Sequence, residues 1–310
     1  MHHTHLTTTT ATTAAALLTL TLATPATAQP TPQPDYPGHT TSHYIPLPQT
    51  NDHAHTNGCT QAQADTNGLT ILFFGTQEDD DTLRQPGTGP DTTTERTPTT
   101  DALDYAHHWA RGFTECATPD TTTHLALGVN NKDDGGPTGT HAGTTWATTI
   151  DTAQQRSTTP NVTITGAIDA EPAWSTPDWA HDWLNAYTST TTAPLYAANS
   201  ADGCPTDGDG PCNNDWTLQD VHTAAGAAHD NVHLIPQIYR TDGTQARQWA
   251  NIHTHGDNGT LHFTGAMSQH TACDQRTCDG TDNTPEQAWT QLKDALGTDE
   301  LGPATDMRWP

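Results

Sequence analysis

Short apolar runs alternate with amphipathic stretches along most of this chain. Runs rich in Val, Ile, Leu, Thr and Ala predict strands at 69–75, 123–131, 161–171, 194–198, 232–239 and 261–267. Apolar residues at helical spacing predict helices at 101–116, 140–155, 177–187, 217–228, 244–252 and 284–296. The regular alternation predicts an α/β fold with a parallel sheet.

Strand–helix units of this kind form either an open doubly wound sheet or a closed (β/α)8 barrel. The first strand is followed by no GxGxxG, and no GxxxxGK[ST] occurs, so a nucleotide-binding sheet loses support. The segment 56–310 has about the length of a typical barrel, which is ~250 residues. We therefore favour a single TIM barrel of irregular or incomplete form, and Tyr44–Leu47 is a candidate for a missing strand.

The N-terminal segment resembles an export signal. Residues 14–23 are apolar, and Ala26-Thr27-Ala28 fits a small-x-small cleavage site, although the preceding residues offer only histidines and the terminal amine as positive charge. We expect residues 1–28 to be a signal peptide, residues 29–55 to be a Pro/Thr-rich arm, and the mature protein to be secreted. No later apolar run is long enough to span a bilayer.

Six cysteines fit disulfides in an oxidising compartment better than zinc ligands. No CxxC occurs, which argues against a zinc ribbon or a thioredoxin-type site. Proximity along the chain predicts the pairs Cys204–Cys212 and Cys273–Cys278, and it leaves Cys59–Cys116 as the long closure.

The formal charge is −26, with ten Lys and Arg against 36 Asp and Glu. Such an acidic surface repels phosphate backbones, so we expect no nucleic-acid partner. We also expect a monomer without a cofactor and without membrane contact after the signal is removed.

The stretch NVTITGAIDAEPAW carries the strongest candidate chemistry. Asp169 and Glu171 lie two residues apart at the end of a strand, so both carboxylates point to the same face. Two neighbouring carboxylates raise one pKa, which keeps one group protonated and able to act as an acid. The alternatives are a solvated pair that caps the following helix, or an ion pair with Arg240.

Other strand ends carry amides and one tyrosine, which are groups that hold sugar hydroxyls. The candidate substrate-binding residues are Gln77, Asn130, Asn131, Asn199, Gln237, Tyr239 and Gln269, with Trp174 as a stacking platform. Polar strand ends also arise simply because they reach solvent. Trp179 and Trp183, spaced by four, fit packing of their helix onto the barrel better than a sugar platform.

ITGAIDAEPAW resembles the D-x-E strand of (β/α)8-barrel glycoside hydrolases, as in the chitinase-like and barrel-type muramidase families. The resemblance implies that Glu171 is the acid and that Asp169 assists, and Tyr239 matches their substrate-holding tyrosine. The longer acidic run of chitinases is absent, because Gly166 and Ala167 stand in its place. Two hypotheses follow: a secreted glycosidase of a cell-wall or chitin-like polysaccharide, or a non-catalytic barrel that binds a glycan or a cell-surface partner.

Nineteen histidines also raise the question of a metal. Asp52-His53-Ala54-His55 resembles the opening of metal-dependent barrel hydrolases, but it follows a polar segment instead of an apolar strand. Because HxH arises by chance at this histidine content, we expect no metal site.

Overall fold

The computed structural model describes residues 35–64, 66–257 and 259–309. The expected signal peptide lies outside the described residues. The parallel strands are β1 (His39–Tyr44), β2 (Gly68–Glu78), β5 (Thr123–Asn130), β6 (Val162–Asp169), β7 (Leu195–Ala197), β8 (Val232–Leu234), β9 (Met267–Ser268) and β10 (Ala304–Arg308). They are hydrogen-bonded in the order β8-β7-β6-β5-β2-β1-β10-β9, and every pair along this path is parallel.

Two short contacts close this sheet into a barrel. Leu234 at the end of β8 pairs with Phe263, and Gln237 pairs with Met267 of β9, both in parallel fashion. The Ile238 N–H donates to the Met267 carbonyl at 2.8 Å, and the Met267 N–H donates to the Pro236 carbonyl at 2.9 Å. The fold is therefore an irregular (β/α)8-type barrel, as expected.

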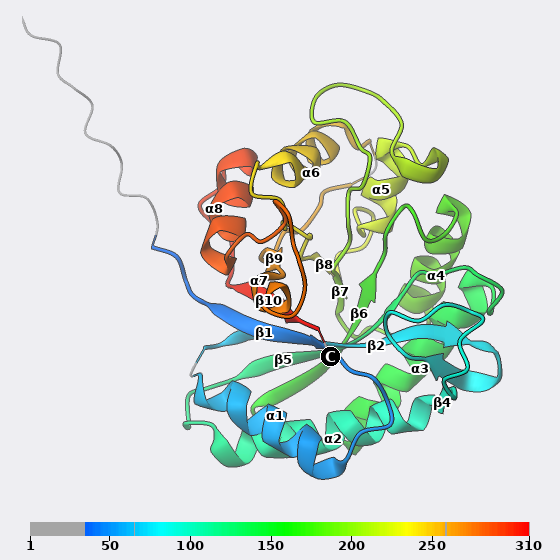
Figure 1. Ribbon diagram of the computed structural model, residues 1–310, viewed down its shortest axis with the longest axis vertical. Helices are drawn as coiled ribbons and strands as arrows, with labels where there is room; N and C mark the ends of the chain where they lie inside the picture. Colours follow the sequence, from blue (N-terminus) through cyan, green and yellow to red (C-terminus); the bar gives the residue numbers. More distant parts are fainter. Residues whose placement is uncertain (1–34, 65, 258, 310) are drawn as a thin grey trace, which may run out of the picture. The chain divides into compact units, whose positions relative to one another are not determined.

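The helices lie around the outside of the strands (Figure 1). They are α1 (Asn51–Gln63), α2 (Thr99–Cys116), α3 (Gly139–Arg156), α4 (Pro177–Thr190), α5 (Leu218–Ala224), α6 (Thr244–His255), α7 (His270–Cys273) and α8 (Pro285–Leu296). Four of these helices, α1, α3, α4 and α8, begin with a threonine N-cap. In each, the Thr side chain accepts a hydrogen bond from the backbone N–H of the residue three positions later. The segment between β2 and α2 contains a 3₁₀ turn (Asp79–Asp81) and the short strands β3 (Thr82–Arg84) and β4 (Thr97–Pro98).

Successive side chains of β2 point alternately into two apolar layers, one inside the barrel and one between the strands and the helices. Ile71 and Phe73 pack inside the barrel, whereas Leu72 and Phe74 pack outward against the helices. The same alternation places Ala167 of β6 in the inner cluster. Asp169, two residues further, shares this inner face.

The first part of the barrel differs from the sequence expectation. The arm is expected from the sequence to supply a missing strand at Tyr44–Leu47, but the strand that it contributes is β1 at residues 39–44, between β2 and β10. Helix α1 follows directly, although its polar sequence gives almost no apolar stripe. Its buried side is made of small residues that pack closely against α2, and such a face carries little hydrophobic signal.

The expected strand 261–267 is largely wrong. Only Met267–Ser268 forms a named strand there, with an isolated bridge at Phe263. Strand β8 is also shorter than expected, because it ends before Pro236, which has no N–H to donate.

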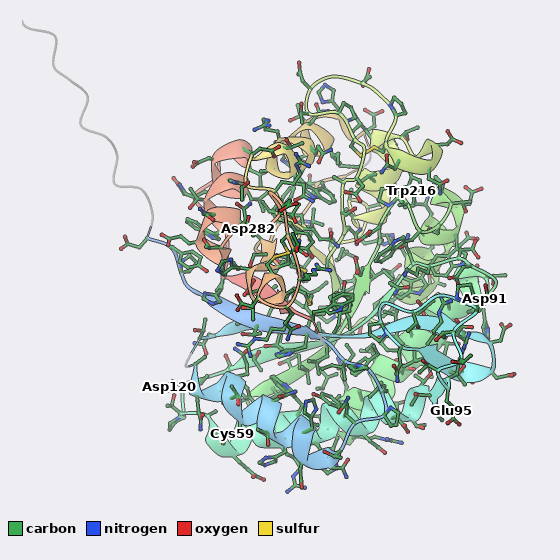
Figure 2. All side chains as sticks on the ribbon, in the orientation of Figure 1. Cys59, Asp91, Glu95, Asp120, Trp216 and Asp282 are labelled. Atoms are coloured by element: carbon green, nitrogen blue, oxygen red, sulfur yellow. A yellow bond between two sulfur atoms is a disulfide. The ribbon has the colours of Figure 1, made fainter. Side chains whose placement is uncertain are left out.

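All three expected disulfides are present. Cys59–Cys116 joins α1 to α2, and Cys204–Cys212 and Cys273–Cys278 close short loops. Cys59 is labelled on the α1 side of the barrel in Figure 2. The long closure therefore ties α1, the helix with the weakest apolar stripe, to its neighbour.

Candidate active site

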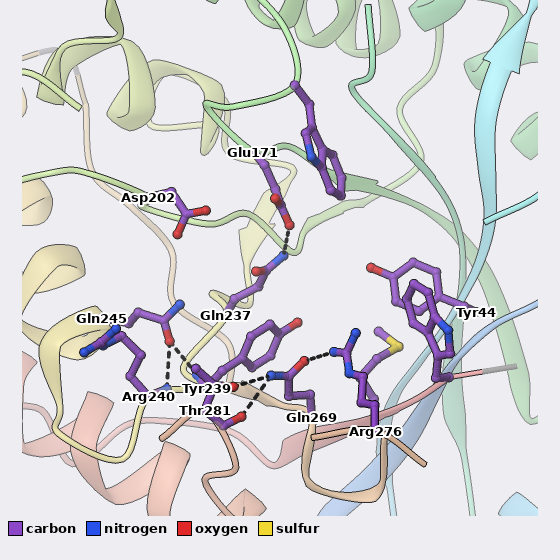
Figure 3. Close-up of a pocket in the computed structure, with 13 residues that line it drawn as sticks. Tyr44, Glu171, Asp202, Gln237, Tyr239, Arg240, Gln245, Gln269, Arg276 and Thr281 are labelled. Atoms are coloured by element: carbon purple, nitrogen blue, oxygen red, sulfur yellow. Dashed lines mark hydrogen bonds between the residues drawn. The ribbon is translucent and has the colours of Figure 1, made fainter. Parts of the chain in front are cut away.

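A cavity of about 380 Å³ lies at the carboxyl end of the barrel, and we call it the main cavity. Its lining residues are Tyr44, Glu171, Trp174, Asp202, Gln237, Tyr239, Arg240, Gln245, Gln269, Arg276, Thr281, Met307 and Trp309 (Figure 3). They come from the ends of β1 and β10 and from the segments that follow β6, β7, β8 and β9. Substrate sites of barrel enzymes lie at this end of the strands.

Asp169 is buried at the base of this site. Its side chain is 1% exposed, and both oxygens accept hydrogen bonds. The Tyr44 hydroxyl donates to Oδ2 at 2.8 Å, and Gln237 Nε2 donates to Oδ1 at 2.9 Å. Tyr44 comes from β1 and Gln237 follows β8, so this carboxylate joins three separated parts of the barrel.

Glu171 faces the main cavity, and its backbone is fixed from below. The Glu171 N–H donates to Asn131 Oδ1 at 2.9 Å, and Asn131 Nδ2 donates to the Glu171 carbonyl at 3.1 Å. The Glu171 carboxylate accepts from Gln237 Nε2 at 3.3 Å. Gln237 therefore donates to both members of the acidic pair (Figure 3 shows the Glu171 contact).

The surroundings favour the protonated form of both acids. Burial raises the pKa of Asp169, and the hydrogen bond from Tyr44 offsets part of this effect. Burial also raises the pKa of Glu171 well above its usual value, and the negative charges of Asp169 and Asp202 raise it further. A carboxyl group that keeps its proton and faces a cavity can donate that proton to a bound molecule.

The alternative of an ion pair between Glu171 and Arg240 does not occur. The Arg240 guanidinium instead binds Asp242, with Nη2 and Oδ2 2.5 Å apart. Glu171 is left with an amide donor and no cation within salt-bridge distance among the described residues. No ion pair in the described part of the chain therefore counteracts the effect of burial on the pKa of Glu171.

Amides and aromatic rings form the rest of the wall. Gln245 Oε1 accepts from the backbone N–H groups of Tyr239 and Arg240, which holds the Tyr239 segment in place. Gln269 Nε2 donates to the Thr281 carbonyl at 2.9 Å. Burial raises the pKa of Tyr239 well above its usual value, so its hydroxyl stays a proton donor at working pH.

Trp174 lines the main cavity. The Lys132 ammonium lies 4.7 Å from the centre of its ring, which leaves a cation beside the acids. Trp179 and Trp183 are buried instead, and Trp183 donates from Nε1 to Gln77 Oε1 at 3.0 Å. These two tryptophans pack α4 onto the barrel.

Several expected substrate-binding residues lie outside the main cavity. Gln77 bonds to the α3 backbone and to Trp183, and Asn130 Oδ1 accepts from Thr76 at 3.0 Å. Asn131 supports Glu171, and Asn199 Oδ1 accepts from the Ala170 N–H at 3.2 Å. These four amides satisfy buried groups of the scaffold, whereas Gln237, Tyr239, Gln269 and Trp174 face the cavity.

Sequence reasoning missed part of the lining. Tyr44 ends β1 and Trp309 follows β10, and neither strand has a long apolar run that would mark its end. Asp202, Arg276 and Thr281 lie in loops that follow β7 and β9, where no periodicity marks a position. The sequence offers a usable signal only for Arg276, which lies between Cys273 and Cys278 in a loop that the expected disulfide closes.

Comparison with known proteins adds nothing to the fold assignment. No protein-family model and no curated protein matches this chain. Among solved structures, the chain is similar to an endo-1,4-beta-mannanase from Rhizomucor miehei, with a TM-score of 0.45 and 10% identity over 87% of this chain and 85% of the mannanase. This likeness is too distant to carry an argument, and the barrel assignment rests on the strand order and closure.

Both HxH motifs lie on described helices. His53 and His55 lie on α1, and His253 and His255 lie in the last turn of α6. Within the described ranges, no three His, Cys, Asp or Glu side chains gather as metal ligands.

No described helix is both long enough and apolar enough to cross a membrane.

Proposed function

We propose that this protein is a secreted glycoside hydrolase that cleaves a cell-wall or chitin-like polysaccharide. The observation that carries the proposal is Glu171, a carboxyl group whose pKa is raised by burial and by Asp169 and that faces a cavity lined by amides and aromatic rings. Glycosidic cleavage needs such an acid, and sugar binding needs such walls.

In the proposed reaction, the Glu171 carboxyl group donates its proton to the glycosidic oxygen. The bond between that oxygen and the anomeric carbon breaks, and positive charge develops on the sugar ring. Asp169 assists from below through Gln237, which both carboxylates share as a donor. Water then adds to the anomeric carbon, and its proton restores the Glu171 carboxyl group.

Asp202 is the second carboxylate that lines the main cavity, whereas Asp169 is enclosed by Tyr44 and Gln237. Burial raises the pKa of Asp202 as well. We therefore assign Asp202, rather than Asp169, as the group that contacts the attacking water or the charged sugar. Asp169 acts as a positioning residue that also holds the proton on Glu171.

The test measures release of reducing ends from peptidoglycan and from chitin by the wild type and by Glu171→Gln. Glu171→Gln keeps the shape and removes the acid, so activity should fall by about 100-fold or more. Glu115→Gln, an exposed change on α2, serves as the charge-matched control and should leave activity unchanged. Equal release by wild type and Glu171→Gln, or none by the wild type, contradicts the proposal.

A non-catalytic role as a glycan-binding barrel is the second candidate. It is favoured by the complete enclosure of Asp169, which removes one carboxylate of the D-x-E pair from direct contact with a ligand. In that case the wild type binds chitin or peptidoglycan fragments without releasing reducing ends.

A further inference from the structure

A second cavity of about 320 Å³ adjoins the main cavity, and we call it the neighbouring cavity. Its lining residues are His43, Tyr44, Ile45, Pro46, Gln49, His53, Asn57, Thr271, Gln275, Arg308 and Trp309. Tyr44 and Trp309 line both cavities, and their ring centres lie 4.6 Å apart in an edge arrangement. The two hollows therefore meet at this aromatic pair.

The charge of the neighbouring cavity is opposite to that of the whole protein. Its lining contains Arg308 and two histidines but no carboxylate, in a chain with a formal charge of −26. Burial lowers the pKa of His43 to about 4, so this histidine is neutral near pH 7. Arg308 therefore carries the permanent positive charge of this cavity.

A second arginine lies on the main-cavity side of the same aromatic pair. Arg276 belongs to the loop closed by Cys273–Cys278, and its guanidinium lies 5.1 Å from the Trp309 ring centre. It donates to the Gln269 side chain (Figure 3). Trp309 thus has an arginine beside each of the cavities that it lines.

Neither arginine is neutralised within the described part of the protein. Six other cations there have carboxylate partners within 4.0 Å: Arg84, Arg96, Arg111, Arg156, Arg240 and Lys293. No described carboxylate lies within that distance of Arg276 or Arg308. Arg247 and Lys132 also lack a carboxylate within that distance, but neither lines the main or the neighbouring cavity. In a chain with more than three carboxylates for each cation, two unpaired arginines around one ring indicate an external anion.

We propose that Arg276, Arg308 and Trp309 form a carboxylate-binding subsite, which extends the main cavity and selects an acidic polysaccharide. A guanidinium binds a carboxylate with two parallel N–H···O bonds, and the indole ring receives the face of the same sugar. The substrate chain then runs from Glu171 across the Tyr44–Trp309 pair into the neighbouring cavity. This inference deepens the proposed function, because it names the charge class of the polymer that Glu171 would cleave.

The experiment uses two polymers that differ only in charge. Peptide-free glycan strands of peptidoglycan carry lactyl carboxylates, and chemical reduction of these groups to alcohols gives a neutral strand of the same length. Titration calorimetry measures binding of octasaccharides of each form to Glu171→Gln, in which turnover is blocked. Further variants add Arg276→Gln or Arg308→Gln to the Glu171→Gln protein. The matched control adds Arg156→Gln, a substitution on α3 at a residue that lines neither cavity.

We expect the acidic octasaccharide to bind at least tenfold more tightly than the reduced one at low salt. Each arginine substitution should weaken binding of the acidic form by about tenfold and leave the reduced form unchanged. Arg156→Gln should change neither, and 0.5 M NaCl should shrink the preference.

Equal affinity for the two forms, absence of binding, or a preference that survives both arginine substitutions overturns the inference. These results are distinguishable from failure of the proposed function. A preference that depends on the arginines, together with no release of reducing ends by the wild type, supports the subsite and rejects hydrolysis. Hydrolysis without any preference for the acidic strand supports the enzyme and rejects the subsite.

Discussion

Asp169→Asn should stabilise this protein, and the gain should grow with pH. Burial raises the pKa of Asp169 from 3.8 to about 7, so the folded state keeps a proton that the unfolded state has lost. Stability therefore falls as pH rises from about 4 to about 7, because ionising this group costs more in the folded protein. Asparagine is neutral at every pH and removes that cost.

The structure also accommodates the amide that Asp169→Asn introduces. The new amide oxygen accepts from Gln237 Nε2 as the carboxylate does, while the new NH₂ group donates to the Tyr44 hydroxyl. Tyr44 lines the main cavity, so its own proton can turn toward solvent. The raised pKa of Asp169 corresponds to a cost of roughly 4 kcal/mol at pH 8, of which about 2 kcal/mol is already present at pH 5. The pH-dependent part of the gain is therefore ~2–3 kcal/mol.

Thermal unfolding of wild type and Asp169→Asn at pH 5 and pH 8 measures this difference. At ~2 °C per kcal/mol for a domain of this size, the advantage of the variant in Tm should be ~4–6 °C larger at pH 8. Asp182→Asn, which removes an exposed carboxylate from α4, controls for the general relief of negative charge. An advantage that is constant with pH, or matched by Asp182→Asn, would refute the reasoning.

Three further predictions concern the scaffold. Replacing Cys59 and Cys116 by serine opens a loop with a sequence separation of 57 and should cost ~4 kcal/mol, against ~2 kcal/mol for Cys273 and Cys278, as measured by urea unfolding under non-reducing conditions. Gly58→Ala should cost ~3 kcal/mol, because the new Cβ lies 2.0 Å from the Trp109 carbonyl oxygen, whereas Gly89→Ala meets nothing within 4 Å. Asn131→Ala removes two hydrogen bonds to the Glu171 backbone, so kcat should fall about tenfold while KM stays nearly the same. An unchanged kcat would contradict the positioning role of Asn131.

The sequence predicts the parts of this protein that have a strong local pattern. Buried strands such as β5 and β6 are short runs rich in Leu, Ile, Val, Ala and Thr, and α2 and α8 have clear apolar stripes. The three disulfides follow from proximity alone. The direction of Asp169 and Glu171 follows from the two-residue period of a strand.

Elements that depend on tertiary contacts could not be predicted in the same way. Helix α1 packs by close approach of backbones, in which Gly58 meets Trp109 and Gly112 meets His55, and such contacts leave no apolar period. The amides of Gln77 and Asn199 resemble the cavity amides in sequence. They differ only in what surrounds them, since one bonds to Trp183 and the other to the Ala170 N–H.

The raised pKa of Glu171 and the stability cost of Asp169 have the same origin. That origin is burial of both carboxyl groups, and the single side-chain nitrogen of Gln237, which donates to Asp169 at 2.9 Å and to Glu171 at 3.3 Å, offsets only part of its effect. A better-satisfied pair would ionise at lower pH, and Glu171 would then lose the proton that the proposed reaction needs. Asp169→Asn removes the cost of burying one charge, and it also removes the negative charge that raises the pKa of Glu171 beyond the effect of burial, so stability and acid chemistry should change in opposite directions at this position.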